Sequence, residues 1–71
     1  MEAVVDVRGL MCPEPVLITR RELERLQKGR VRVIADAAAA RDNITRLAQH
    51  AGWRVTVTAE GNAWVLLLEK E

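Results

Sequence analysis

Apolar residues recur along the first half of the chain with the two periods that distinguish strands from helices. A β-branched run at residues 4–7, before Arg8-Gly9, predicts a strand that ends in a tight loop. From residue 13 to about residue 27 the apolar positions return at helical spacing, and Lys28-Gly29 is expected to end this helix. The apolar positions of the predicted helix are Val16, Thr19, Leu23 and Leu26.

The second half of the chain repeats this pattern and then adds a hairpin. Residues 30–35 predict a second strand, after which Asp36 is expected to cap a helix that Gly52 closes. Residues 53–60 alternate between apolar and polar, as do residues 64–68 after the Gly61-Asn62 turn, so these two strands should form a hairpin. The apolar stripe of the second helix consists of Ala40, Ile44, Leu47, Ala48 and Ala51.

This order of elements predicts the fold class. A helix joins the first two strands, which are therefore expected to be parallel. Polar residues alternate along the third strand, so one face of the sheet should be open to water, and two helices can cover only the other face. The prediction is an α/β (α+β) fold: a two-layer α/β sandwich of βαβαββ order, with a four-stranded mixed sheet and two helices on one face.

Length and composition agree with a small folded protein. The 71 residues suffice for one compact domain with one core, and the 49% hydrophobic and 30% charged fractions are typical of a soluble globular chain. Residues 1–71 are expected to form a single domain. The charged ending Glu69-Lys70-Glu71 is typical of a natural terminus, while a domain of a longer protein stays open as an alternative.

Charge and hydropathy narrow the function classes. The formal net charge is +1, and basic and acidic residues are interspersed, which disfavours nucleic-acid binding. The chain does not start with a basic segment followed by an apolar stretch, and no apolar run reaches membrane-spanning length. We therefore expect a cytoplasmic protein without membrane association, and a monomer is favoured.

The chain contains one cysteine, Cys12. It cannot form an internal disulfide or a cysteine-based zinc site, because these need further thiols or a cluster of histidines, and the chain has one histidine, His50. We expect neither a metal nor a cofactor. Cys12 is therefore either inert packing or the centre of the chemistry, and its position favours chemistry.

Cys12 stands where the first loop meets the first helix, and it is followed by Pro13-Glu14-Pro15. A residue before proline avoids the α region, whereas proline is tolerated in a first helical turn, so Cys12 is expected at or near the N-cap. Free N–H groups and the helix dipole at this end favour a thiolate over a thiol. The two prolines should also stiffen the approach to the sulfur.

The number of cysteines also constrains what this thiolate can do. It can attack the outer sulfur of a donor persulfide, and the persulfide so formed is a reversible state of cysteine. Because no second cysteine is present to attack it, the sulfur has to leave to an outside nucleophile. A carrier is therefore favoured over a reductase.

The Gly-Leu-x-Cys-Pro-x-Pro pattern resembles the TusA family of small sulfur-relay proteins, also called SirA-like or YedF-like, and βαβαββ is also the order of that family. The resemblance spans nearly the whole chain. It implies that Cys12 accepts sulfane sulfur from a protein donor, such as a cysteine desulfurase or another sulfurtransferase, and passes it to a protein acceptor. The implied pathways are tRNA thiolation, molybdenum-cofactor synthesis or sulfur oxidation. The matching residues are Gly9, Leu10, Cys12, Pro13, Glu14 and Pro15.

One segment departs from the pattern of many relatives. They have Asp-x-Pro after the second strand, whereas this chain has Asp36-Ala37-Ala38. The nearby Arg41-Asp42-Asn43 is more similar to the YedF-type branch. This leaves the pathway open but not the cysteine chemistry.

Several residues near Cys12 have both a functional and a structural interpretation. Arg8 either stabilises the thiolate or a partner's negative surface, or is simply solvated. The carboxylate of Glu14, near the start of the helix, is expected to interact favourably with the helix dipole. Leu10 and Met11 either cover the edge of the core or form an apolar docking collar around the thiol.

Residues farther from Cys12 are expected to be structural. His50 should interact with the negative end of the second helix. Trp53 and Trp64 are expected to pack in the core. Asp36, Arg41 and Asp42 are interpreted as capping and surface charges, with a partner contact as the alternative.

Other functions remain as alternatives. In a thiol redox or regulatory module, Cys12 would form a mixed disulfide with a partner. Small α/β sandwiches also include RNA-binding modules, although this chain has no Phe or Tyr for base stacking. In a purely structural adaptor, replacing Cys12 with Ser would leave the activity intact.

Overall fold

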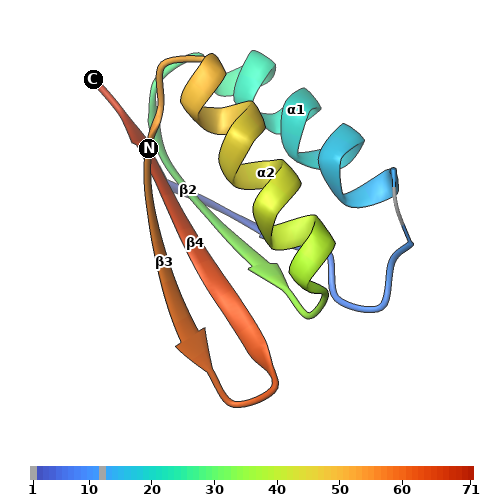
Figure 1. Ribbon diagram of the computed structural model, residues 1–71. Helices are drawn as coiled ribbons and strands as arrows, with labels where there is room; N and C mark the ends of the chain where they lie inside the picture. Colours follow the sequence, from blue (N-terminus) through green and yellow to red (C-terminus); the bar gives the residue numbers. More distant parts are fainter. Residues whose placement is uncertain (1, 12) are drawn as a thin grey trace.

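The computed structural model describes residues 2–11 and 13–71, which form four strands and two helices (Figure 1). Their order, βαβαββ, is the predicted one, and each element lies within a few residues of its expected place. The elements are β1 (Glu2–Asp6), α1 (Glu14–Leu26), β2 (Gly29–Ala35), α2 (Ala38–His50), β3 (Arg54–Glu60) and β4 (Ala63–Lys70).

The sheet is mixed, with the spatial order β1-β2-β4-β3. β1 and β2 are parallel, as expected for strands joined by a helix, and Val5 lies opposite Val33. β4 runs antiparallel to both of its neighbours, so β2 and β4 are the central strands and β1 and β3 are the edges.

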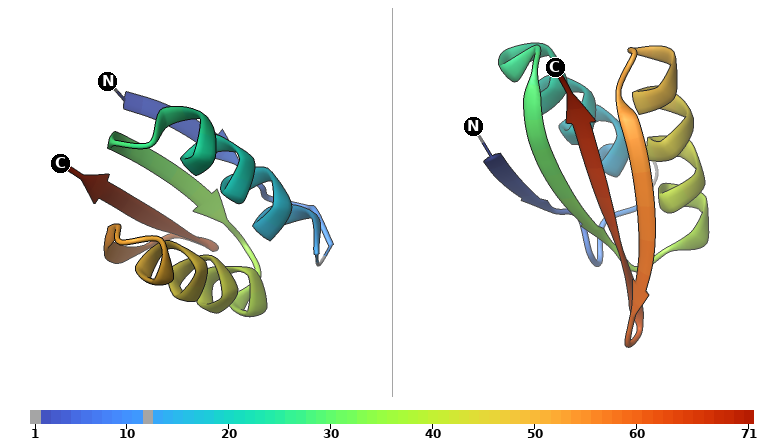
Figure 2. Two further views of the ribbon diagram at one scale, coloured as in Figure 1. Left: turned by 90° about the horizontal axis from the view of Figure 1, so that it is seen from above. Right: turned by 90° about the vertical axis from the view of Figure 1, so that its left-hand side faces the viewer.

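Both helices lie on one face of this sheet, and the other face is open (Figures 1 and 2). The two-layer α/β sandwich predicted from the sequence is therefore confirmed. The core lies between the layers, and its fully buried residues include Val33 and Leu66 of the middle strands and Ile44 of α2. Neither of the helices described is long and apolar enough to cross a membrane.

The two ends of α1 differ slightly from the expectation. The helix begins at Glu14, one residue later than predicted, because Pro13 adopts a non-helical conformation in front of it. At its other end Gln27, not a glycine, takes the left-handed conformation with φ 62°, and its N–H donates to the carbonyl of Leu23. Gly29 then starts β2, so the stop signal Lys28-Gly29 was placed correctly to within two residues.

The expected cap of α2 is wrong. The helix starts after Ala37, which is extended and provides no side-chain hydrogen bond to the first turn. Asp36 precedes it, and its carboxylate accepts the N–H of Gly9 instead. The Asp36 carboxylate already accepts a hydrogen bond from a backbone N–H that is far away in the sequence, so it is not available to cap α2. Spacing along the sequence does not reveal such a distant contact.

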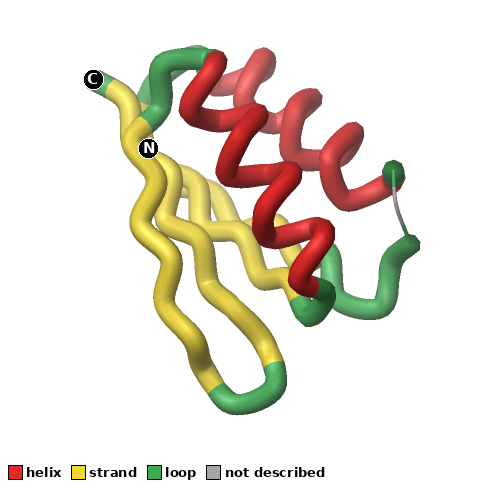
Figure 3. The backbone as a smooth tube through the Cα atoms, viewed as in Figure 1, coloured by secondary structure: helices red, strands yellow, loops and turns green. Residues whose placement is uncertain are grey.

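β3 begins at Arg54, and Trp53 lies before it. Trp53 is 4% exposed, which confirms its core packing, and its backbone N–H donates to the carbonyl of Ala48 at 2.9 Å. Val57, expected on the buried side of the strand, is 41% exposed. Val57 lies opposite the fully buried Leu66 of β4, but β3 is the outermost strand on this side of the sheet (Figure 3), so Val57 has a neighbouring strand on one side only.

Thr19 and Thr45 form a matched pair of partly or fully buried threonines. Thr19 is fully buried in α1, and its hydroxyl has no hydrogen-bond partner among the described residues. Thr45 in α2 donates its hydroxyl to the carbonyl of Arg41 at 2.8 Å.

Because an unsatisfied buried hydroxyl is costly, Thr19→Val should raise the free energy of unfolding by about 1 kcal/mol, whereas Thr45→Val should lower it by about 1 kcal/mol.

Urea unfolding followed by circular dichroism measures both variants. A loss of stability in Thr19→Val as large as that in Thr45→Val would contradict this prediction.

Candidate functional site

The chain segment between β1 and α1 leaves the sheet at the carboxyl ends of the two parallel strands (Figure 1). In open α/β sheets, ligands and reactive groups collect at the carboxyl ends of the parallel strands. Cys12, on which the predicted chemistry depends, lies outside the described residues. The residues on both sides of it are described, and they define the surroundings of the motif.

Arg8 is held by Asp6 rather than being free in solvent. Its backbone N–H and its Nε each donate to Oδ1 of Asp6 at 3.0 Å, and its Nη2 donates to Oδ2 at 2.7 Å. The guanidinium and the backbone N–H of Arg8 lower the pKa of Asp6 to about 2, and the same carboxylate raises the pKa of Arg8. The guanidinium of Arg8 is therefore oriented by Asp6, and its positive charge is paired with a carboxylate of the same segment.

Gly9 fastens this loop to the one that follows β2. Its N–H donates to both carboxylate oxygens of Asp36 at 3.1 Å, a contact between residues 27 positions apart. Gly9 has a φ of 78°, in the left-handed region that side chains rarely adopt. Among the described residues no atom lies within 4 Å of a Cβ built at this position, so it is the backbone conformation that favours glycine here.

Leu10 and Met11 take different roles, which answers a question that the sequence left open. Leu10 is half-buried and packs against the core cluster, and its N–H donates to the carbonyl of Val7. Met11 is 82% exposed. Leu10 thus anchors the loop to the core, and Met11 presents an apolar side chain to solvent directly before Cys12 in the sequence.

The residues after Cys12 form the first turn of α1 in the expected way. The carbonyl of Met11 accepts the N–H of Glu14 at 3.0 Å, and the carbonyl of Pro13 accepts the N–H of Leu17 at 3.1 Å. Pro15 is buried in the first turn, where its missing N–H is not needed. Glu14 is exposed at the positive end of the helix, where a carboxylate is favourable.

A contact that no sequence pattern predicted lies at the same end of the sheet, beside the carboxyl end of β2. The guanidinium of Arg41 lies over the ring of Trp64, 4.6 Å from its centroid, and Arg41 also donates to Asp42 at 2.9 Å. Trp64 pairs with Ala35 across the sheet, next to Asp36. Trp64 is only partly buried, so its expected core packing is completed by Arg41. Only the register of β2 and β4 brings these residues together, and no local pattern indicates it.

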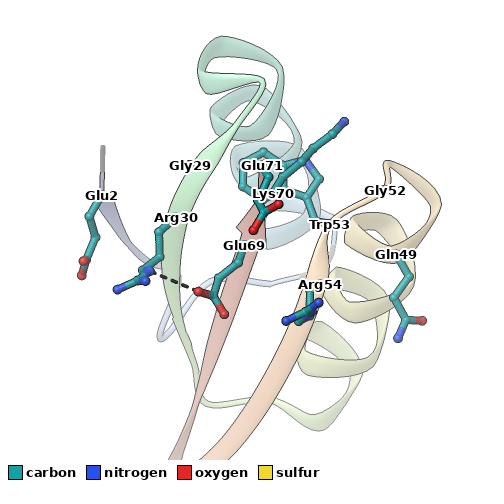
Figure 4. A pocket seen from close by; sticks show the side chains of 10 residues that line it. All are labelled: Glu2, Gly29, Arg30, Gln49, Gly52, Trp53, Arg54, Glu69, Lys70 and Glu71. Atoms are coloured by element: carbon teal, nitrogen blue, oxygen red, sulfur yellow. Dashed lines mark ion pairs between the residues drawn. The ribbon is translucent and has the colours of Figure 1, made fainter.

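The opposite end of the sheet is a shallow depression, shown in Figure 4. Glu2, Arg30, Glu69 and Arg54 lie side by side there on successive strands, and Arg30 pairs with Glu69 at 3.3 Å. Positive and negative side chains alternate across the row, so this end attracts neither anions nor cations strongly. Among the described residues there is also no cluster of His, Cys, Asp and Glu that could hold a metal ion.

Fold and motif together define a class: a small two-layer α/β protein of the sulfur-carrier type, with its single cysteine before the first helix. The family described as "Sulfurtransferase TusA" matches residues 3–70. The chain belongs to this family and is a TusA-like sulfur carrier.

Two relatives support this assignment. The chain is 40% identical over 57 residues to a protein of Methanocaldococcus jannaschii named as a candidate sulfur carrier, and the match covers 79% of this chain and 76% of that one. It also superposes on the crystal structure of a SirA-like protein from Desulfitobacterium hafniense with a TM-score of 0.86 and 26% identity. That match covers 97% of this chain and 99% of the other.

The pairing of Asp6 with Arg8 gives a prediction about pH. In Arg8→Gln the pKa of Asp6 should rise from about 2 toward its ordinary value of 3.8, because the guanidinium is lost. A carboxyl whose pKa is lowered by folding stabilises the fold above its unfolded-state pKa, and this contribution disappears as the pH falls through about 2. The pH dependence of the Asp6 carboxyl carbon shift in NMR measures this pKa.

Asp42 provides the control, since Arg41 lowers its pKa and Arg8 does not contribute. Its titration should be the same in both proteins. A wild-type Asp6 that already titrates near 3.8 would show that the ion pair does not form in solution.

The link between Gly9 and Asp36 gives a second prediction. In Asp36→Ala the N–H of Gly9 loses both of its acceptors, so its proton should exchange with solvent several-fold faster than in the wild type. Asp42→Ala is the matched control, because Asp42 pairs only with its neighbour Arg41 among the interactions described. Amide exchange followed by NMR distinguishes them, and unchanged protection of Gly9 in Asp36→Ala would contradict the contact.

Proposed function

We propose that this protein carries sulfane sulfur as a persulfide on Cys12, receiving it from a donor protein and passing it to an acceptor protein in the cytoplasm. The observation that carries the proposal is the Cys12-Pro13 pair directly before α1 in a chain of the TusA family. A cysteine near the start of a helix is held more readily as the reactive thiolate, because free N–H groups and the helix dipole favour the negative charge.

The neighbours of Cys12 support a docking role. Gly9 and Leu10 fix the loop on one side, through Asp36 and through the core, and Pro13 and Pro15 restrict the backbone on the other. A stiff loop loses little conformational entropy when a partner binds it. Met11, exposed beside Cys12 in the sequence, offers apolar contact to that partner.

Two charged residues complete the proposed site. Arg8 keeps an exposed side chain although Asp6 orients it, so it can contact a negative surface of a partner. Glu14 lies in the first turn of α1 and supports the helix start. Cys12 is the reacting residue, and Arg8, Gly9, Pro13, Glu14 and Pro15 position it.

The proposed transfer is an exchange between sulfur atoms without net oxidation. The thiolate of Cys12 attacks the outer sulfur of the donor's persulfide, the sulfur–sulfur bond of the donor breaks, and the donor cysteine leaves as a thiolate. Cys12 then carries the persulfide, and an acceptor's nucleophile removes its outer sulfur in the same way. The donor chemistry expected is that of a cysteine desulfurase or another sulfurtransferase, and the acceptor would serve tRNA thiolation, cofactor synthesis or sulfur oxidation.

Intact-protein mass spectrometry tests the proposal. The chain is incubated with a cysteine desulfurase and free cysteine, beside a Cys12→Ser variant as control. We expect the wild type alone to gain the mass of one sulfur atom, and a reducing thiol to remove it. Circular dichroism of both proteins should be identical, since the change from Cys to Ser replaces a single atom.

Two other outcomes are distinguishable in the same spectra. Failure to gain sulfur from the desulfurase, from thiosulfate and from polysulfide would refute the carrier function. A mass increase equal to the donor protein, again reversed by a thiol, would indicate a stable mixed disulfide and the redox alternative.

A further inference from the structure

β3 is an edge of the sheet that nothing within the described chain covers on its outer side. It has seven residues, against five in the other edge strand β1, and six of the seven are exposed. Proteins protect such edges with prolines, bulges or charges in the strand centre. Residues 54–60 contain no proline, pair with β4 in an uninterrupted register, and carry charges only at the two ends, Arg54 and Glu60.

The turn between β3 and β4 determines which backbone groups of β3 point outward. Glu60 lies opposite Ala63, so the loop consists of Gly61 and Asn62, and Gly61 has a φ of 60°. A two-residue hairpin of this kind closes on a hydrogen-bonded pair, and such pairs alternate along antiparallel strands. The N–H and carbonyl groups of Glu60, Thr58, Thr56 and Arg54 therefore face β4, and those of Val55, Val57 and Ala59 face away from the sheet.

These outward groups are spaced symmetrically about Val57. If a second β3 pairs antiparallel to the first with the two Val57 residues opposite each other, Val55 faces Ala59 of the other copy, and all of the outward groups find partners. In this register Arg54 of one chain lies opposite Glu60 of the other at both ends, and Thr56 lies opposite Thr58. The strand is thus complementary to itself in hydrogen bonding and in charge.

We propose that two copies of this chain associate through β3, antiparallel and centred on Val57, to form one continuous eight-stranded sheet. The apolar side of the strand supports this choice of occupant. Val57 is 41% exposed, and it lies on the same face of the sheet as its buried cross-strand partner Leu66, because β3 has a neighbouring strand on one side only. In the pair, Val57 of each copy contacts the other and the two Val55–Ala59 pairs flank them, which covers the apolar strip.

The size of this contact makes it weak. A seven-residue strand is about 23 Å long, and a single strand pair buries less than the about 1,200 Å² at which stable interfaces begin. The pair should therefore form at high protein concentration, and the monomer favoured by the sequence is the form at low concentration. The proposal does not depend on Cys12 or on sulfur transfer.

Sedimentation velocity of the full chain tests the association, with a reducing agent present so that Cys12 cannot link two chains by a disulfide. The apparent mass should rise from 8.0 kDa toward twice that value as the concentration increases from about 10 μM to about 1 mM, the range of a weak interface. Added salt should weaken the association, because the Arg54–Glu60 contacts are exposed. Amide shifts in NMR should change with concentration along residues 54–60, most strongly at Val55, Val57 and Ala59.

Val57→Pro tests the register directly. Its N–H points away from β4, so proline at this edge position removes a donor of the proposed pair without breaking the hairpin. The variant should remain monomeric at every concentration, whereas Val57→Thr, which keeps the N–H and favours strands, should still associate. Glu60→Arg places two guanidinium groups opposite each other at each end and should also prevent association, independently of whether the proline variant folds.

Each outcome decides the proposal. Concentration-dependent mass, shifts confined to residues 54–60 and loss of both in Glu60→Arg would establish it. A monomeric wild type up to about 1 mM would overturn it and leave the edge to a strand of another protein. A dimer that persists in Glu60→Arg, or shifts that lie on another face, would overturn this register and assign the association to a different surface.

Discussion

A layer of two helices is too narrow to cover a four-stranded sheet completely, and the main features of this protein follow from that limit. The helices cover mainly the central strands β2 and β4, whose residues Val33 and Leu66 are fully buried. One face of the sheet stays open and carries the charged and polar residues of the strands. β3 is an edge strand at the margin of the helix layer, so Val57 is exposed on the face where the sequence pattern predicts burial.

The same arrangement brings the reactive segment together. β1 and β2 are parallel neighbours, so the loops that follow them leave the sheet at one edge. Asp36 in the second loop can then accept the N–H of Gly9 in the first. The loop before Cys12 is thereby attached to the entrance of α2 as well as to β1, and the proposed carrier site rests on both halves of the fold.

The elements, their order and the layers could be predicted from the sequence, because periodicity and turn residues are local signals. The cysteine motif was visible for the same reason, since Cys12, Pro13 and Pro15 are close in sequence. Contacts between distant segments were not predictable: the interaction of Asp36 with Gly9, and that of Arg41 with Trp64, both depend on strand order and register. Asp36 was accordingly assigned to a cap by its position, although its carboxylate is used elsewhere. Val57 shows the converse limit, because alternation indicates a face of the sheet but not how far a helix extends over it.

The stacking of Arg41 on Trp64 also has an optical consequence. The chain has two tryptophans and no tyrosine, so its near-ultraviolet signal comes from these two rings. Trp53 is sealed in the core, whereas Trp64 is partly accessible beneath a guanidinium, one strand away from Ala35 and the loop that holds Gly9. Any protein that binds this edge and displaces Arg41 changes the emission of one ring and not of the other. The molecule therefore contains an intrinsic fluorophore at the edge where its partners are proposed to bind, and a reference fluorophore in its core.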